Sequence, residues 1–224
     1  GFAGEERIGF CRETRGRAAL EAMTARLEGT VELPYPLRVS VMDHPMVNAF
    51  AVPGGRVVLF RGLIEKAGSP EEVAGVLAHE IAHVVHRDPT VGVLRSAGTA
   101  GILGLLVGDV FGAAVVVAGT EAVMKAQYQQ AVEARADATA VEMLTEAGLP
   151  SEPFADFFRR LAEERDVNLG LLEYLASHPA LEDRAERAAA GDAVGGAPFR
   201  PALDDGQWLA LRQICSESAP EPGG

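Results

Sequence analysis

The sequence predicts an α+β fold that is mostly helical, with a small antiparallel sheet ahead of a buried helix. Apolar residues recur at helical spacing over most of the chain, whereas strand-like runs bounded by turn residues are confined to residues 37–60. The composition agrees, because 48% of the residues are hydrophobic and only 6% are aromatic. A chain of 224 residues is long enough to form one domain with a full core.

The N-terminal part of the chain predicts one helix followed by strands. The helix should span residues 5–28 and end at Gly29. Strands should follow at residues 37–42, 47–52 and 56–60. Pro53-Gly54-Gly55 is the expected turn between the last two strands.

The remainder of the chain predicts helices. A long one should run from about Glu121 to Ala147, because Gly148 and Pro150 end the pattern. Others are expected at residues 69–88, after Ser151-Glu152-Pro153, and at residues 171–176 and 181–190. We therefore expect a single domain over residues 1–190 and a tail over residues 191–224, rich in Gly, Pro and acids, in which residues 208–211 could dock.

The strongest motif is H-E-x-x-H, formed by His79-Glu80-Ile81-Ala82-His83. Positions four apart on a helix share one face, so the imidazoles of His79 and His83 can converge on one metal ion. Glu80 then lies beside the metal, where it can take a proton from water and pass it to the leaving amine. This spacing is the sequence form of a zinc hydrolase site.

The surroundings of the motif predict a buried helix. Apolar residues flank both histidines, and burying two imidazoles and a carboxylate without partners would be costly. Ser69-Pro70-Glu71-Glu72 offers a Ser N-cap, Pro at the first helical position and Glu at the capping-box position. The helix should end near Asp88-Pro89.

A catalytic zinc usually takes three protein ligands, and the third has three candidates. His86 shares the face of His79 and His83 but lies about 10 Å along the axis from His79, out of reach of the same metal. His178 lies in a predicted loop before Pro179. Glu133 lies on the long helix, and we favour it as the ligand.

A second carboxylate supports this choice of ligand. Asp137 lies one helical turn beyond Glu133, on the same face. It is therefore placed to accept the outer N–H of a ligating histidine and to fix its tautomer. The alternative is that both acids are solvated, since charged residues on helices are mostly exposed, and the H-E-x-x-H motif favours the metal site over it.

The ordered set of motifs resembles the gluzincin metallopeptidases of family forty-eight, which include the CaaX prenyl protease, the HtpX heat-shock protease and the mitochondrial overlapping-activity protease. The resemblance rests on H-E-x-x-H, then E-x-x-x-D on a later helix, then His178-Pro179 with Arg184 six residues after the histidine. The strand, turn and strand before the metal helix are also similar, and the likeness covers roughly residues 39–187. It implies a zincin-like metalloprotease domain with one zinc ion per chain.

The resemblance also implies roles for further residues. His178 or Arg184 would stabilise the oxyanion formed on peptide cleavage, although His178 could instead cap a helix and Arg184 could pair with neighbouring acids. The strand Asn48-Ala49-Phe50-Ala51 would bind an extended polypeptide substrate through its backbone.

Residues 96–118 form an apolar segment in which Asp109 is the single charge. At 23 residues it is long enough to span a bilayer, but a central Asp is costly there. Two short helices meeting near Gly108 would satisfy both observations. We expect a hairpin inserted between the two ligand helices, which would cover the active site, contact a membrane, or pack as buried core.

Charge and cysteine content limit the kinds of partner and the cellular compartment that the sequence fits. A net charge of −12 argues against nucleic acid as a partner. Cys11 and Cys215 could form one disulfide in an exported protein, or they could be two free thiols. The chain begins without Met or a hydrophobic signal, as a mature or trimmed fragment would. The resemblance favours the cell envelope, either the periplasm or the membrane.

Two hypotheses of function follow from the sequence. The first is a zinc endopeptidase that acts on unfolded or misassembled proteins. The second is a chaperone-like or assembly module that keeps the metal behind a closed, latent site. An intact Glu80 favours the enzyme. The sequence names neither the natural substrate nor the oligomeric state.

Overall fold

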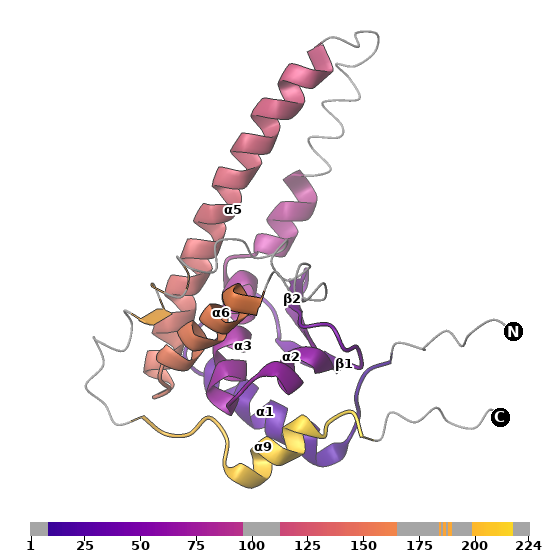
Figure 1. Ribbon diagram of the computed structural model, residues 1–224, viewed down its shortest axis with the longest axis vertical. Coiled ribbons are helices and arrows are strands. Elements are labelled where there is room, and N and C mark those ends of the chain that lie inside the picture. The colour runs from indigo at the N-terminus through magenta and orange to yellow at the C-terminus, as the bar shows by residue number, and fades with distance from the viewer. Residues whose placement is uncertain are drawn as a thin grey trace, which may run out of the picture.

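The computed structural model describes residues 9–95, 113–164 and 199–216, together with Arg184, Glu186, Ala188 and Ala189. Within the second range, side chains are described for residues 128–163. The described elements are helices α1 (Thr14–Glu28), α2 (Arg61–Lys66), α3 (Pro70–Val85), α5 (Ala113–Glu146), α6 (Glu152–Glu164) and α9 (Asp205–Arg212), and strands β1 (Arg38–Met42), β2 (Ala49–Val52) and β3 (Arg56–Phe60) (Figure 1). The predicted α+β class is confirmed.

Helix α1 begins later than the sequence pattern predicted. The Glu13 side chain accepts hydrogen bonds from the backbone N–H groups of Arg15 and Gly16, which fixes the N-cap at residue 13. Ahead of this cap the chain runs beside β1 instead, and Cys11 N donates to Val41 O at 2.8 Å. Residues 9–13 are therefore extended, and the helix prediction was wrong for them. Residues 5–8 lie outside the described part.

The sheet is mixed, with strand order β1-β3-β2. Strands β2 and β3 are antiparallel and are joined by the predicted turn, where Gly54 and Gly55 have φ of 89° and 77°. Strands β1 and β3 are parallel, so the prediction of a purely antiparallel sheet was wrong. The run from Val57 to Phe60 is buried throughout, as expected for the central strand β3. In the strand order of the described sheet, β2 lies at an edge.

Helix α3 runs through the core and contacts α5, α6, β2 and β3. Its start matches the prediction, because Ser69 Oγ accepts from Glu72 N at 3.3 Å and Pro70 is the first residue. It ends at Val85, three residues before Asp88. Arg87 has a φ of 57°, in the left-handed region, and this breaks the helix before the chain becomes helical again at residues 88–95.

Helix α5 is the longest described element and extends well beyond the body formed by α1, α3 and the sheet (Figure 1). It starts earlier than predicted and includes residues 113–118 of the expected hairpin. The remaining hairpin residues, 96–112, lie outside the described part, as does the short helix expected at residues 171–176. Within the described residues, no helix has the length and apolar character needed to cross a bilayer.

The C-terminal segment packs against the start of the chain. Helix α9 packs on α1. Gly16 of α1 lies so close to α9 that a Cβ at this position would come within 2.7 Å of Ala210 O. Leu211 and Ile214 are buried, so residues 208–211 dock as the sequence allowed. Cys11 and Cys215 form a disulfide, which decides between the two alternatives left open above.

This disulfide closes a loop spanning 204 residues, so it should contribute strongly to stability. We expect reduction, or the Cys11→Ser/Cys215→Ser double substitution, to lower the free energy of unfolding by roughly 3 to 5 kcal/mol. Urea unfolding with and without reductant measures this. The double variant is the control, because reductant should not change its stability; an unchanged midpoint in the reduced wild type would contradict the expectation.

Candidate metal centre

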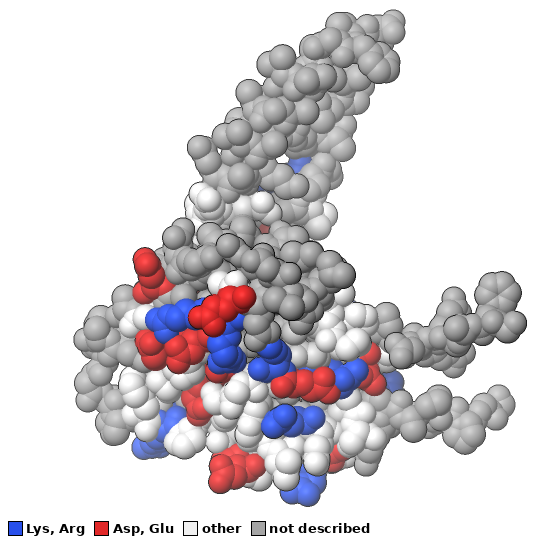
Figure 2. Space-filling model, in the orientation of Figure 1, with Lys and Arg blue, Asp and Glu red and all other residues white. Residues whose placement is uncertain are grey.

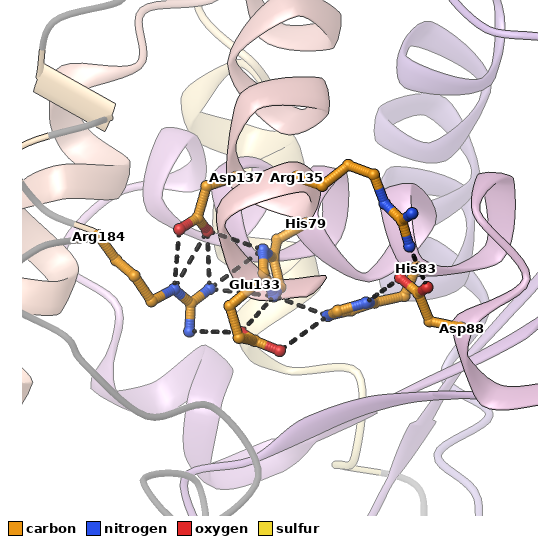
Figure 3. Close-up of polar contacts among 7 residues, drawn as sticks. All are labelled: His79, His83, Asp88, Glu133, Arg135, Asp137 and Arg184. Carbon is orange, nitrogen blue, oxygen red and sulfur yellow. Dashed lines mark hydrogen bonds and ion pairs between the residues drawn. The ribbon is translucent and has the colours of Figure 1, made fainter. Parts of the chain in front are cut away.

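Three buried side chains bring their donor atoms to one point. His79 and His83 lie one turn apart on α3, and their Nε2 atoms are 2.9 Å from each other. Glu133 reaches them from α5, with Oε2 at 3.3 Å from His79 Nε2 and Oε1 at 3.5 Å from His83 Nε2 (Figure 3). All three donor atoms lie within 4.8 Å of one another. The structure thus brings together the three predicted ligands.

The outer nitrogen of each imidazole contacts a carboxylate. His79 Nδ1 lies 3.0 Å from Asp137 Oδ1, as expected from the one-turn spacing of Glu133 and Asp137. His83 Nδ1 lies 3.0 Å from Asp88 Oδ2 (Figure 3). A proton held on Nδ1 by a carboxylate leaves the lone pair of Nε2 directed to the shared point.

Sequence reasoning missed Asp88, which was interpreted only as the end of the helix. On an uninterrupted helix, a residue five positions after His83 would lie about 140° around the axis from it. The left-handed backbone of Arg87 instead turns the chain so that Asp88 faces back to His83. The available signal was Asp88-Pro89 itself, a helix break with a carboxylate directly beside the motif.

Arg184 is fully buried at the centre and contacts Glu133 and Asp137 of α5. Its Nε and Nη2 donate to Asp137 Oδ1 at 3.1 and 3.0 Å, and Nη1 lies 3.2 Å from Glu133 Oε2. The guanidinium carbon is 4.2 Å from the ring centroid of Phe158, so the cation also stacks on an aromatic face. Arg184 therefore offsets part of the negative charge of these two buried carboxylates.

These contacts shift two pKa values. Burial alone would raise the pKa of Asp137, but the charge of Arg184 and the hydrogen bond to His79 outweigh it and hold that pKa far below its ordinary value. Burial and the Arg184 charge lower the pKa of His79, yet its hydrogen bonds to Asp137 and Glu133 outweigh both, so the pKa is raised. In the metal-free site a proton therefore competes with a metal ion for His79.

A cavity of about 230 Å³ opens beside the centre. Glu80, His83 and Glu133 line it from the metal side, so the predicted base faces the same space as the ligands. Residues of β2 and α5 line it as well, namely Phe50, Ala51, Tyr128, Gln129 and Val132, together with Asp88 and Pro89.

The other predicted site residues are placed as follows. Asn48 is buried, and its Oδ1 accepts from Ala49 N at 2.8 Å. His86 Nε2 contacts Thr139 Oγ1 at 2.9 Å, away from the ligand group, which agrees with its rejection as a ligand. His178 lies outside the described residues.

The donor set fits a catalytic zinc ion. Two imidazole nitrogens and one carboxylate are the ligands typical of such sites, and the adjoining cavity leaves room for water or substrate at a fourth position. Cys11, Asp43 and Cys215 also lie close together, but a disulfide consumes both thiols of that group. Within the described residues, the His79, His83 and Glu133 group is therefore the better metal site.

Sequence comparison agrees with this geometry. Residues 15–191 match the profile of peptidase family M48, which covers most of the chain. The chain belongs to peptidase family M48. It therefore carries the peptidase domain of a metalloprotease. The matched range contains all three candidate ligands, Glu80 and both supporting carboxylates.

Several relatives in this family are named for proteolysis. The chain is 29% identical over 168 residues to the mitochondrial metalloendopeptidase OMA1 of Arabidopsis thaliana, covering 75% of this chain and 33% of that protein. It is 34% identical over 164 residues to a putative beta-barrel assembly-enhancing protease of Vibrio cholerae, covering 68% and 34%. It is 43% identical over 81 residues to an HtpX protease homolog of Moorella thermoacetica, covering 34% and 26%. The chain thus spans about a third of the first two relatives.

The lowered pKa of Asp137 predicts an acid-dependent loss of stability in the metal-free protein. A depressed carboxylate pKa stabilises the fold at pH values above the unfolded value of about 3.8, and this contribution is lost as pH falls toward the folded pKa. The excess in free energy of unfolding of the wild type over Asp137→Asn should therefore shrink as pH falls below about 4. Urea unfolding of both proteins across pH measures this; a difference that stays constant down to pH 3 would contradict it.

Proposed function

We propose that this chain is a zinc-dependent endopeptidase that cleaves unfolded or misassembled polypeptides. The observation that carries the proposal is the convergence of His79, His83 and Glu133 beside a cavity that Glu80 also lines. A purely structural zinc site is usually closed by four protein ligands, whereas a catalytic site keeps an open position. The relatives named as proteases support the same reaction.

Glu80 has the position required of a general base. It follows His79 on α3, is completely buried and lines the cavity next to His83 and Glu133. A zinc ion held by the three ligands would lower the pKa of water and polarise the scissile carbonyl. Glu80 would then take the proton from the attacking water and deliver it to the leaving amine. Its burial removes competing bulk water from this transfer.

Strand β2 offers an edge for substrate binding. Phe60 N donates to Asn48 O at 2.9 Å, so in this antiparallel register Ala49 and Ala51 direct their backbone groups away from β3. Ala51 also lines the cavity. We propose that an extended substrate adds to this edge, with its scissile bond beside Glu80 and an apolar side chain against Phe50 and Val132.

The role of Arg184 follows from its burial. With no exposed surface, it contacts Asp137, Glu133 and His79. We propose that it positions these groups, and that of the two donors implied by the family resemblance, His178 and Arg184, it is His178 that donates to the oxyanion. The substitution Arg184→Met would leave two buried acids without their countercharge, so it would affect folding as well as catalysis.

We place the chain in an oxidising compartment, most simply the bacterial cell envelope. The disulfide between Cys11 and Cys215 supports this, because such bonds persist in exported proteins and are rare in the cytosol. One relative is named a beta-barrel assembly-enhancing protease, which suggests misassembled proteins as substrates. Nucleic acid is a poor partner, since the net charge is −12 and the viewed face mixes acidic and basic side chains over its described part (Figure 2).

The substitution Glu80→Gln tests the proposed function directly. It should leave one zinc ion per chain but lower the cleavage rate of an unfolded protein such as casein by about 10²- to 10⁴-fold, the usual contribution of a general base. Glu65→Gln, on the exposed side of α2, is the matched control and should cleave at the wild-type rate. Zinc content and the rate of casein fragmentation are the two measurements. A wild type that holds zinc and cleaves nothing would instead support the chaperone-like alternative.

The substitution Ala51→Pro tests substrate addition to β2. Proline removes the outward N–H of Ala51 but breaks no bond to β3, so the edge strand should persist. Losing one backbone hydrogen bond to substrate should lower kcat/KM about three- to tenfold, mainly through KM. Ala51→Val keeps the N–H and is the control. Equal kcat/KM for the two variants would exclude the strand-addition mode.

A further inference from the structure

We propose that Asp88 is a positioning residue of the metal centre, acting on His83, and that Arg135 holds Asp88 in place. This inference rests on the proposed zinc site and assigns it a second supporting carboxylate beside Asp137. It concerns residues from two different elements, the turn after α3 and helix α5 (Figure 3).

The contact between His83 and Asp88 is short, and both side chains are largely buried. His83 Nδ1 lies 3.0 Å from Asp88 Oδ2, and the two side chains keep only 8% and 9% of their accessible surface. On the other side of the ring, His83 Nε2 faces His79 and Glu133. Asp88 thereby selects the tautomer with its proton on Nδ1, which is the one that presents Nε2 to a metal ion.

The second carboxylate oxygen of Asp88 also has a hydrogen-bond partner. Arg135 Nη2 donates to Asp88 Oδ1 at 2.5 Å, so the carboxylate joins the imidazole on α3 to a cation on α5. Arg135 is 49% exposed, and an ion pair so open to solvent contributes little to stability. The role we propose for it is to orient Asp88, because its contact with Oδ1 leaves Oδ2 toward His83.

The backbone conformation at Arg87 is required for this contact. A left-handed φ of 57° is unfavourable for a residue with a side chain, and such strain persists where the surrounding structure imposes it. Here it ends α3 and turns Asp88 back to His83. The same turn starts the helix at residues 88–95, so the position of that helix and the orientation of His83 are set together.

The two imidazoles then have equivalent support. Asp137 holds His79 and is itself held by Arg184; Asp88 holds His83 and is itself held by Arg135. Each pair follows the same order of imidazole, carboxylate and guanidinium. Removing such a supporting carboxylate from a metal site typically weakens metal binding 10- to 100-fold.

The test is the zinc affinity of the intact chain, measured by competition with a chromophoric chelator. Asp88→Ala should bind zinc about 10- to 100-fold more weakly than the wild type. Asp88→Asn retains an oxygen that accepts from His83 and should lose less. Asp43→Ala is the matched control, since Asp43 also pairs with an arginine, Arg61 Nε at 2.6 Å, but lies outside the site; its zinc affinity should equal that of the wild type.

A purely structural role for Asp88 would give a different pattern. It would lower the melting temperature of the zinc-free protein and leave the affinity of the folded fraction for zinc unchanged. We expect the reverse, with Asp88→Ala and Asp43→Ala alike in melting temperature and different in zinc affinity. Should Asp88→Ala fail to fold, the affinity of Asp88→Asn decides, because a value equal to the wild type would overturn the proposal.

Arg135→Gln completes a double-substitution cycle. Alone it should weaken zinc binding by less than Asp88→Ala does, and in the Asp88→Ala background it should have no further effect. An equal loss in both backgrounds would overturn the role given to Arg135. A wild type that binds no zinc would overturn the proposed function together with this inference, whereas wild-type affinity in Asp88→Ala would overturn the inference alone.

Discussion

Helix α3 carries two imidazoles and a carboxylate into the apolar core, and the rest of the site depends on compensating that burial. His79 and Glu80 have no exposed surface, and Glu133 and Asp137 approach from α5 almost as deeply buried. Burial of such groups is costly unless hydrogen bonds and opposite charges accompany them. The packing of α3 against α5 therefore has to align these polar groups as well as bury apolar side chains. Buried Arg184 supplies positive charge beside Glu133 and Asp137, which lowers the cost of burying them.

The same hydrogen bonds that compensate burial also orient the candidate ligands. Hydrogen bonds that each Nδ1 donates to a carboxylate fix the imidazoles with Nδ1 outward and Nε2 inward, so three donor atoms converge on one point. Glu80 lines the cavity next to these donors, and Phe50 and Ala51 of β2, an edge strand among the described ones, line the same cavity. Helix α5 supplies the candidate ligand Glu133, the carboxylate Asp137 and the cation Arg135, so the arrangement of the candidate site depends on its position on α3.

Spacing along a helix explains what the sequence could predict. The separation of Glu133 and Asp137 depends only on helical geometry, and so does that of the two histidines, so the sequence predicts that each pair shares one helix face. Asp88 was missed because its contact depends on a left-handed backbone at Arg87, which hydrophobic periodicity does not encode. The parallel pairing of β1 with β3 and the bonding of Cys215 depend on contacts between distant segments, and local pattern carries no information on those.

The central claim is that His79, His83 and Glu133 together hold one zinc ion. The most direct measurement is anomalous diffraction at the zinc absorption edge, from crystals of the chain loaded with one equivalent of zinc. The account predicts one strong peak, about 2.0–2.2 Å from the Nε2 atom of each histidine and from a carboxylate oxygen of Glu133. A peak elsewhere on the chain, or an ion bound to either histidine through Nδ1, would contradict it.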